Sequence, residues 1–191
     1  MADYVVTEAG FGADLGAEKF FNIKCRKAGL SPDAVVLVAT TKALKMHGGV
    51  KKEDLKEENI QAVKDGCKNL ERHIQNIGKF GVPVTVGINE YYTDTKDEHQ
   101  AIIDFCQSHG VACVISSHWK NGGKGAADLA SHVAELVDGN VSSFKTLYDN
   151  EMPLWDKTKH IATNIYGAED IIADKKVRNK FKQLEEDGYG N

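Results

Sequence analysis

Apolar residues recur along the chain in two alternating patterns, short β-rich runs and longer stripes at helical spacing. Three of the runs are read as strands, at residues 34–40, 82–88 and 111–116. The first of these is apolar on both faces, as a central parallel strand would be. A fourth run, at residues 4–7, is also read as a strand. Because each run is followed by a loop and a helical stretch, we expect an α/β fold. This order predicts a three-layer arrangement, with a mainly parallel sheet and helices on both faces.

Apolar stripes with steps of three and four residues predict the helices between these strands. The longest stripe ends near residue 79 and contains Ile60, Val63, Cys67, Leu70, Ile74 and Ile77. Thr95 and Glu98 have the spacing of a capping box at the start of another helix, which ends at Gly110. The remaining helices are predicted near residues 14–28, 126–137, 143–150 and 175–186. This pattern divides the chain into an α/β lobe at residues 1–140 and a mainly helical extension at 141–191.

Aromatic residues follow several of the predicted strands at the edge where ligands bind in parallel sheets. They are Phe11, Tyr91, Tyr92 and Trp119. For Tyr91, Tyr92 or Trp119 alone, a side chain that caps the core is a sufficient explanation. Phe11 lies between glycines, where a core position is difficult, so we read it as a stacking surface. Together the four rings predict a site for a planar heterocycle such as a pterin, adenine or nicotinamide.

Two glycine-rich loops offer candidate anion sites. The first, at residues 8–16, has the spacing G-x-G-x-x-x-G, which fits a nucleotide-binding loop or an ordinary tight turn. The second, GGKG at residues 122–125, fits a phosphate cradle around Lys124 or a loop with solvated lysines. Neither loop is a Walker sequence. His47, in a Met-His-Gly-Gly turn, fits a catalytic role or a structural, solvent-exposed one, and no partner for it is identifiable.

Composition excludes several classes of protein. The net charge of −4 argues against a nucleic-acid partner, and the absence of an 18-residue apolar stretch predicts no membrane span. The four cysteines form no C-x-x-C pair, so we expect reduced, inert thiols in the cytoplasm. The histidines lack metal-ligand spacing, and no nucleophile and base can be paired with any specificity. We read Asp94 and Glu98 as turn and cap residues, and assign no catalytic residue and no metal site.

A long segment, DYVVTEAGFGADLGAEKFFNIKCR, resembles formate–tetrahydrofolate ligases. The other segments of the family follow in the same order: DAVVLVAT, ALKMHGGV, FGVPVTVGINEYYTDT, HWKNGGKGAADLA and KTKHIATNIYGAEDI. The resemblance implies that ATP phosphorylates formate and that the N10 amine of tetrahydrofolate then attacks the formyl carbon and expels phosphate. It also implies Mg²⁺ with ATP, an assisting monovalent cation, a cytoplasmic location and a homotetramer.

The resemblance implies roles for individual residues. Gly10 and Phe11 match a loop that lines the family's adenine and pterin cleft. Tyr91 and Trp119 match the pair that encloses a flat ring, and Tyr92 lies beside the same cleft. A phenylalanine is usual in the family at the position of Tyr91, and proline is common at that of Tyr92, so two hydroxyl groups are added here.

Departures from the family affect the expected chemistry. Thr41 and Lys42 replace the usual Val-Arg, and lysine lacks the planar donor fork of arginine. We regard Lys42, together with His47 and Lys124, only as possible anion contacts. The family's P-loop lies before the matched region, so we expect a P-loop NTPase-like lobe without its P-loop.

Three functions are weighed for such a chain. The first is one part of the ligase, as an excised domain, fragment or truncated homologue that is inactive alone. The second is a binding module for folate or nucleotide without turnover. A nicotinamide-dependent oxidoreductase is disfavoured, because residues 40–42 offer no acidic group at the end of the predicted strand at residues 34–40.

Overall fold

The computed structural model describes residues 2–190. Their Cα positions divide the chain into two compact units. Unit 1 joins the residues up to Leu30 with those from Lys145 onward, and unit 2 comprises Ser31–Phe144. Unit 2 contains the sheet, whereas unit 1 is helical with extended connections. The predicted division at residue 140 remains a prediction.

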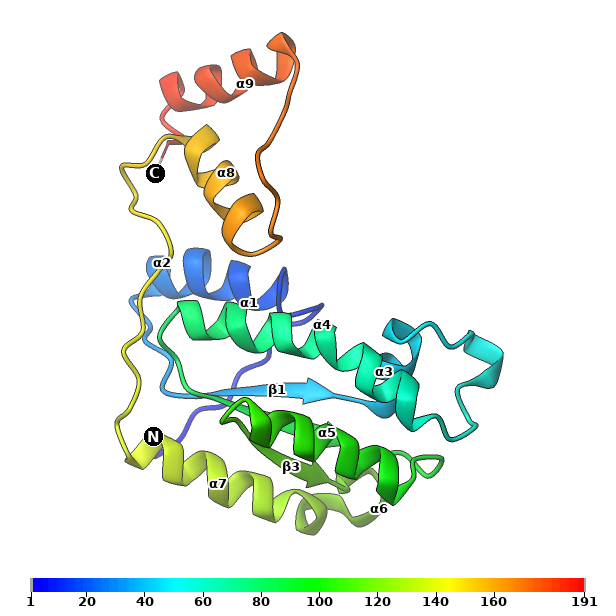
Figure 1. The fold of residues 1–191 in the computed structure, drawn as a ribbon. Helices are drawn as coiled ribbons and strands as arrows, with labels where there is room; N and C mark the ends of the chain where they lie inside the picture. The colour runs from blue at the N-terminus through cyan, green and yellow to red at the C-terminus, as the bar shows by residue number, and fades with distance from the viewer. Residues whose placement is uncertain (1, 191) are drawn as a thin grey trace. The chain divides into compact units, whose positions relative to one another are not determined.

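The sheet of unit 2 has three parallel strands in the order β1-β2-β3 (Figure 1). The strands are β1 (Val35–Ala39), β2 (Val84–Asn89) and β3 (Ala112–Ser116). In this register Leu37 lies beside Val86, which lies beside Cys113. The parallel α/β fold predicted from the sequence is therefore confirmed.

Helices cover both faces of the sheet. On the face of Val86, α4 (Ile60–Lys79) packs against α5 (Lys96–Ser108). The opposite face is covered by α7 (Ala127–Asp138). A Cβ placed on Gly87 would come within 3.2 Å of Leu129 of α7, so glycine allows this helix to approach β2 closely. The three layers follow from these two packings.

The predicted apolar stripe of α4 forms the centre of the core. Val63, Cys67, Leu70 and Ile77 are almost fully buried, as the steps of three and four predict. Two short helices precede α4: α3 (Thr41–His47) and the 3-10 helix η2 (Lys52–Asp54). No helix was predicted at residues 41–47, where His47 was expected in a turn, so α3 is a correction to the expected order of elements. Thr40 caps α3 by accepting a hydrogen bond from the backbone N–H of Ala43 at 3.1 Å.

The four cysteines are free thiols. Three of them are buried, and Cys113 is partly exposed. Burial raises the pKa of Cys67 to about 12, with a smaller contribution from Cys106. The Cys67 thiol is therefore protonated at neutral pH and unreactive, as expected for a core residue.

Unit 1 begins with a continuous helical stretch of three parts: α1 (Gly16–Lys19), the π-helix η1 (Phe20–Cys25) and α2 (Arg26–Ala28). It ends at Gly29, whose left-handed φ of 63° favours glycine. The second pair of helices is α8 (Leu154–Asn164) and α9 (Lys175–Glu186), joined by an edge-on contact between Trp155 and Phe181. The predicted helix at residues 175–186 is confirmed as α9, whereas no helix was predicted at α8.

Two predicted elements are absent from the described residues. Residues 4–7 form no strand, and the side chains of Val5 and Val6 are 81% and 89% exposed. A β-rich composition does not make a strand without a neighbouring strand to pair with. Residues 143–150 form no helix. Their amides bond to other segments instead, because Ser143 N–H donates to the Gly81 carbonyl and Leu147 N–H donates to Asn22 Oδ1.

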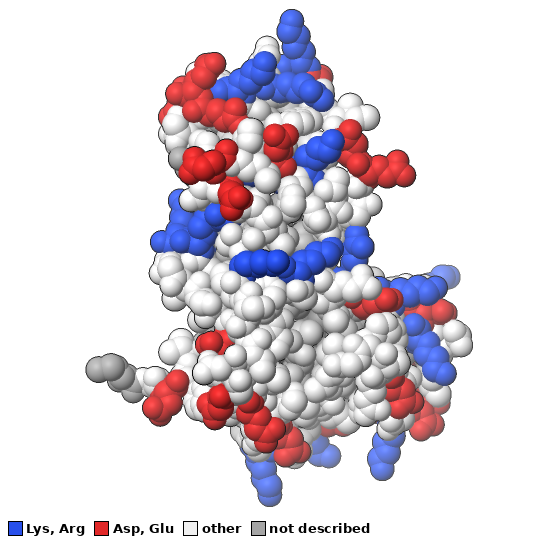
Figure 2. All heavy atoms as spheres, turned by 60° about the vertical axis from the view of Figure 1, so that its left-hand side comes forward, with Lys and Arg blue, Asp and Glu red and all other residues white. Residues whose placement is uncertain are grey.

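Charged side chains of both signs are interspersed on the face shown in Figure 2. Within α9 the signs are separated, because its five lysine and arginine residues precede Glu185 and Glu186. No helix among residues 2–190 combines the length and apolar character needed to cross a membrane.

Candidate functional site

A small crevice of about 160 Å³ opens at the carboxyl ends of β2 and β3. It is lined by Asn89, Tyr91, His118 and Trp119. Asn89 is the last residue of β2, and it pairs with Ser116, the last residue of β3. The parallel order of the strands therefore brings together two loops that lie far apart in the sequence. Ligands bind at this edge in open α/β sheets.

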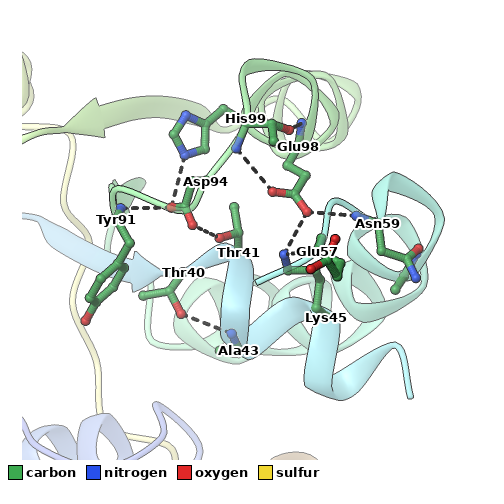
Figure 3. Close-up of polar contacts among 12 residues, drawn as sticks. Thr40, Thr41, Ala43, Lys45, Glu57, Asn59, Tyr91, Asp94, Glu98 and His99 are labelled. Carbon is green, nitrogen blue, oxygen red and sulfur yellow. Dashed lines mark hydrogen bonds and ion pairs between the residues drawn. The ribbon is translucent and has the colours of Figure 1, made fainter. Parts of the chain in front are cut away.

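The position of Tyr91 is fixed by Asp94, whose side chain is only 1% exposed (Figure 3). One carboxylate oxygen accepts a hydrogen bond from the backbone N–H of Tyr91 at 2.9 Å and lies 3.3 Å from His99 Nε2. The other oxygen accepts a hydrogen bond from the hydroxyl of Thr41. Burial alone raises the pKa of Asp94, but these hydrogen bonds outweigh it and lower the pKa overall. Asp94 is therefore an ionised anchor that connects the Tyr91 loop to α3 and α5.

A second buried network lies beside the first and holds α5 in place (Figure 3). Lys45 Nζ lies 2.8 Å from Glu98 Oε1 and donates to the Glu57 carbonyl at 2.9 Å. Glu98 also accepts hydrogen bonds from the backbone N–H groups of Asn59 and Thr95, at 3.0 and 3.2 Å. Burial raises the pKa of Glu98, but Lys45 and the two backbone N–H groups together lower it below its usual value. The predicted capping box of Thr95 and Glu98 is confirmed. Glu98 is in addition the acidic partner of a buried ion pair with Lys45.

The other wall of the crevice belongs to α6 (His118–Asn121), which leads into the 3-10 helix η3 (Gly122–Ala126). The chain folds back at η3, so that the N–H of Ser117 donates to the Gly125 carbonyl at 2.9 Å. Trp119 is 77% exposed, so its ring is open to a ligand. The glycine-rich loop thus acts as a turn that presents His118 and Trp119.

Replacing Gly125 with alanine is expected to destabilise this turn. The new Cβ would lie 2.6 Å from the backbone of Ser117, so the backbone would have to shift. We expect Gly125→Ala to reduce the free energy of unfolding by roughly 1–3 kcal/mol, measured by urea denaturation. Gly123→Ala is the matched control in the same 3-10 helix, because no atom lies within 4 Å of its added Cβ. Equal stability of the two variants would contradict this assignment.

Lys42 lies above the aromatic pair of the other loop. Its Nζ is 4.5 Å from the centre of the Tyr91 ring and 6.0 Å from that of Tyr92. These are cation–π distances. Lys42 is the second residue of α3, and its ammonium group lies over the ring of a residue that lines the crevice. It could therefore offer a positive charge to a ligand with an anionic substituent.

A family model described as formate–tetrahydrofolate ligase matches residues 1–191. The chain belongs to this family. It is 63% identical over 191 residues to the formate–tetrahydrofolate ligase of Granulibacter bethesdensis, and covers 33% of that protein. The identities to the ligases of Sinorhizobium medicae and Pelagibacter ubique are 58% and 56%, with 34% of each covered. The chain thus spans about a third of the length of these curated relatives.

The residues predicted for the formate–tetrahydrofolate ligase cleft fall into two groups. Tyr91 and Trp119 line the crevice, and Tyr92 lies beside Tyr91 and is 84% exposed. Gly10 and Phe11 belong to unit 1. Phe11 is 87% exposed and has a left-handed φ of 69°. Its convergence with the other two rings remains a prediction.

The candidate anion contacts lie on two elements, α3 and η3. His47 is the last residue of α3 and is exposed, and Lys124 is exposed within η3. Lys42, by contrast, lies at cation–π distance from Tyr91, which lines the crevice. In the described part of the chain, no three His, Cys, Asp or Glu side chains gather as metal ligands.

Sequence reasoning missed two residues of the crevice, Asn89 and His118. His118 directly precedes Trp119 and follows a predicted strand, so its position was a usable signal. Asn89 follows the predicted strand at residues 82–88 and was placed in the loop, whereas it is the last residue of β2. The role of Asp94 as an anchor was also missed, because it depends on His99 and Thr41, which lie on different elements.

Proposed function

We propose that this chain forms the ring-binding part of a formate–tetrahydrofolate ligase. The observation that carries the proposal is the crevice at the carboxyl edge of the sheet, with Tyr91 and Trp119 in its lining. Aromatic faces favour a flat heterocycle through stacking, in addition to the burial of apolar area. The two rings are presented by separate loops, each fixed by its own hydrogen bonds, so little ordering is needed when a ligand binds.

In the whole ligase, ATP converts formate to formyl phosphate, and tetrahydrofolate receives the formyl group at N10. The contribution of this chain is to hold and orient the pterin or adenine ring between Tyr91 and Trp119. Proximity of this kind accelerates a reaction between two bound groups without a proton transfer by the holding residues. Formate, ATP and tetrahydrofolate are thus proposed partners of the whole enzyme. Assembly as a homo-oligomer and a cytoplasmic location remain predictions.

The described residues show no cluster of basic groups built around the candidate phosphate loop at residues 122–125. Phosphoryl transfer needs groups that neutralise the phosphate charge, whereas the GGKG loop is a structural turn and Lys124 is exposed. The described side chains offer no cluster for Mg²⁺. We therefore assign Mg²⁺ and the monovalent cation to no residue here, and expect no formyl transfer by this chain alone.

Replacing Trp119 tests the proposal directly. We expect isothermal titration of the chain with tetrahydrofolate to show saturable binding, and Trp119→Ala to weaken it roughly ten-fold, because one stacking wall is lost. Trp119→Phe retains an aromatic face and should stay within about three-fold of the wild type. Equal affinities for all three proteins, or no binding of either tetrahydrofolate or an ATP analogue to the wild type, would contradict the proposal.

The alternative is a binding module without any role in turnover. Mixing the chain with the remaining two-thirds of a relative's ligase and assaying ATP-dependent formyl transfer separates the two functions. Activity that appears only in the mixture supports the ligase part. Binding of tetrahydrofolate without recovered activity supports the binding module.

A further inference from the structure

The crevice has two polar residues in addition to its aromatic walls. Asn89 and His118 line it together with Tyr91 and Trp119. Stacking alone distinguishes poorly between flat rings, because every aromatic ligand has a π-face. Hydrogen bonds to the edge of the ring can discriminate much more strongly, since a mismatched ligand leaves a polar group unpaired.

The imidazole of His118 is oriented by a buried neighbour. Its Nδ1 lies 2.8 Å from the hydroxyl oxygen of Ser116. Ser116 is 5% exposed and is itself fixed, because its carbonyl accepts a hydrogen bond from Glu90 N–H at 3.1 Å. One ring nitrogen is therefore engaged within the protein. Among the described residues, no hydrogen-bond partner contacts the other nitrogen, Nε2.

Because the His118 ring is held by Ser116 and its Nε2 has no partner among the described residues, Nε2 is suited to form a directional hydrogen bond with a ligand. When Ser116 donates to Nδ1, the neutral imidazole carries its proton on Nε2 and donates to the ligand. When Nδ1–H donates to Ser116, Nε2 accepts instead. Because the serine hydroxyl allows both arrangements, Nε2 can match either a donor or an acceptor on the edge of a heterocycle.

We infer that His118 is a specificity-determining residue, whose Nε2 hydrogen-bonds to the polar edge of the ring bound between Tyr91 and Trp119, and that Ser116 is its positioning residue. The ligand class is a fused nitrogen heterocycle with donors and acceptors on its edge, such as a pterin. This inference rests on the proposed function of the crevice, and it adds a directional contact to the stacking.

Substitutions of His118 separate a hydrogen bond from simple contact. We expect His118→Ala and His118→Phe each to weaken tetrahydrofolate binding by about 3- to 10-fold in isothermal titration. His118→Gln places an amide nitrogen near the position of Nε2 and should stay within about two-fold of the wild type. His118 is exposed, so these variants should fold normally, and circular dichroism checks this. Wild-type affinity in His118→Phe would overturn the inference.

A double-mutant cycle tests the part played by Ser116. Ser116→Ala should weaken binding about two- to three-fold when His118 is present and should have no effect in the His118→Ala background. Losses that simply multiply would show that Ser116 does not act through His118, and would overturn its positioning role.

Failure of the inference and failure of the proposed function have different signatures. If the wild type does not bind tetrahydrofolate or an ATP analogue, the crevice is not a ring site and both fall. If the wild type binds and Trp119→Ala weakens binding, but His118→Ala does not, the proposed function stands and the inference alone is overturned.

Discussion

Lys45→Met should destabilise the protein by about 3–5 kcal/mol, because it leaves the buried carboxylate of Glu98 without its counter-ion. The side chains of Lys45 and Glu98 are 1% and 0% exposed, so water cannot replace the lost ammonium group. Methionine fills similar volume, which separates the loss of charge from the formation of a cavity. Urea denaturation followed by circular dichroism measures the change in the free energy of unfolding.

Two controls show whether the lone charge is responsible. Lys45→Met combined with Glu98→Gln should recover much of the lost stability, because glutamine keeps a carbonyl acceptor and removes the uncompensated charge. Lys159→Met removes one partner of the exposed Lys159–Asp170 pair and should change stability little. If the double variant is no more stable than Lys45→Met alone, the ion pair is not the source of the effect.

The elements that were predicted correctly are those whose signal is local. The strands β1, β2 and β3 are rich in apolar, mostly β-branched residues, and α4 carries an uninterrupted stripe on one face, so burial and periodicity agree. The α5 cap follows from the spacing of Thr95 and Glu98. In such segments the local preference and the tertiary environment favour the same structure.

The helix α3 was missed because its stability depends on distant residues. Lys45 is fully buried, although lysine is mostly exposed in proteins. Its burial requires Glu98 of α5 and the carbonyl of Glu57, neither of which its neighbours in the sequence reveal. The helix predicted at residues 143–150 does not form, and distant residues are again the cause. Backbone N–H groups of this segment donate to other segments and not to one another.

The candidate site was predictable to the extent that topology determines it. Tyr91 and Trp119 come together because they follow adjacent parallel strands, whose carboxyl ends meet at one edge. Which polar side chains line the crevice depends on the path of each loop. That path is set by contacts such as Asp94 with Tyr91 and Ser117 with Gly125, which no periodicity indicates.

Asp94→Ala should reduce the free energy of unfolding by about 2–4 kcal/mol, because it removes the acceptor of hydrogen bonds from Tyr91 N–H and Thr41 and the partner of His99. The same variant should weaken tetrahydrofolate binding, since the Tyr91 loop loses its anchor. Asp94→Asn keeps one carbonyl oxygen as an acceptor, although its amide group faces another donor. We therefore expect it to lose stability, but less than Asp94→Ala does. Normal stability of Asp94→Ala would show that the network contributes nothing.

The lowered pKa of Asp94 adds a pH dependence of known sign. Because the folded protein favours the ionised carboxylate, the stabilisation is fully present above the ordinary aspartate pKa of about 3.9 and is lost as the pH falls through the lower folded value. The difference in unfolding free energy between wild type and Asp94→Asn should therefore be constant near neutral pH and shrink in acid. Glu98, whose pKa is also lowered, is present in both proteins and cancels from the difference. A difference that grows as the pH falls would contradict an ionised anchor at Asp94.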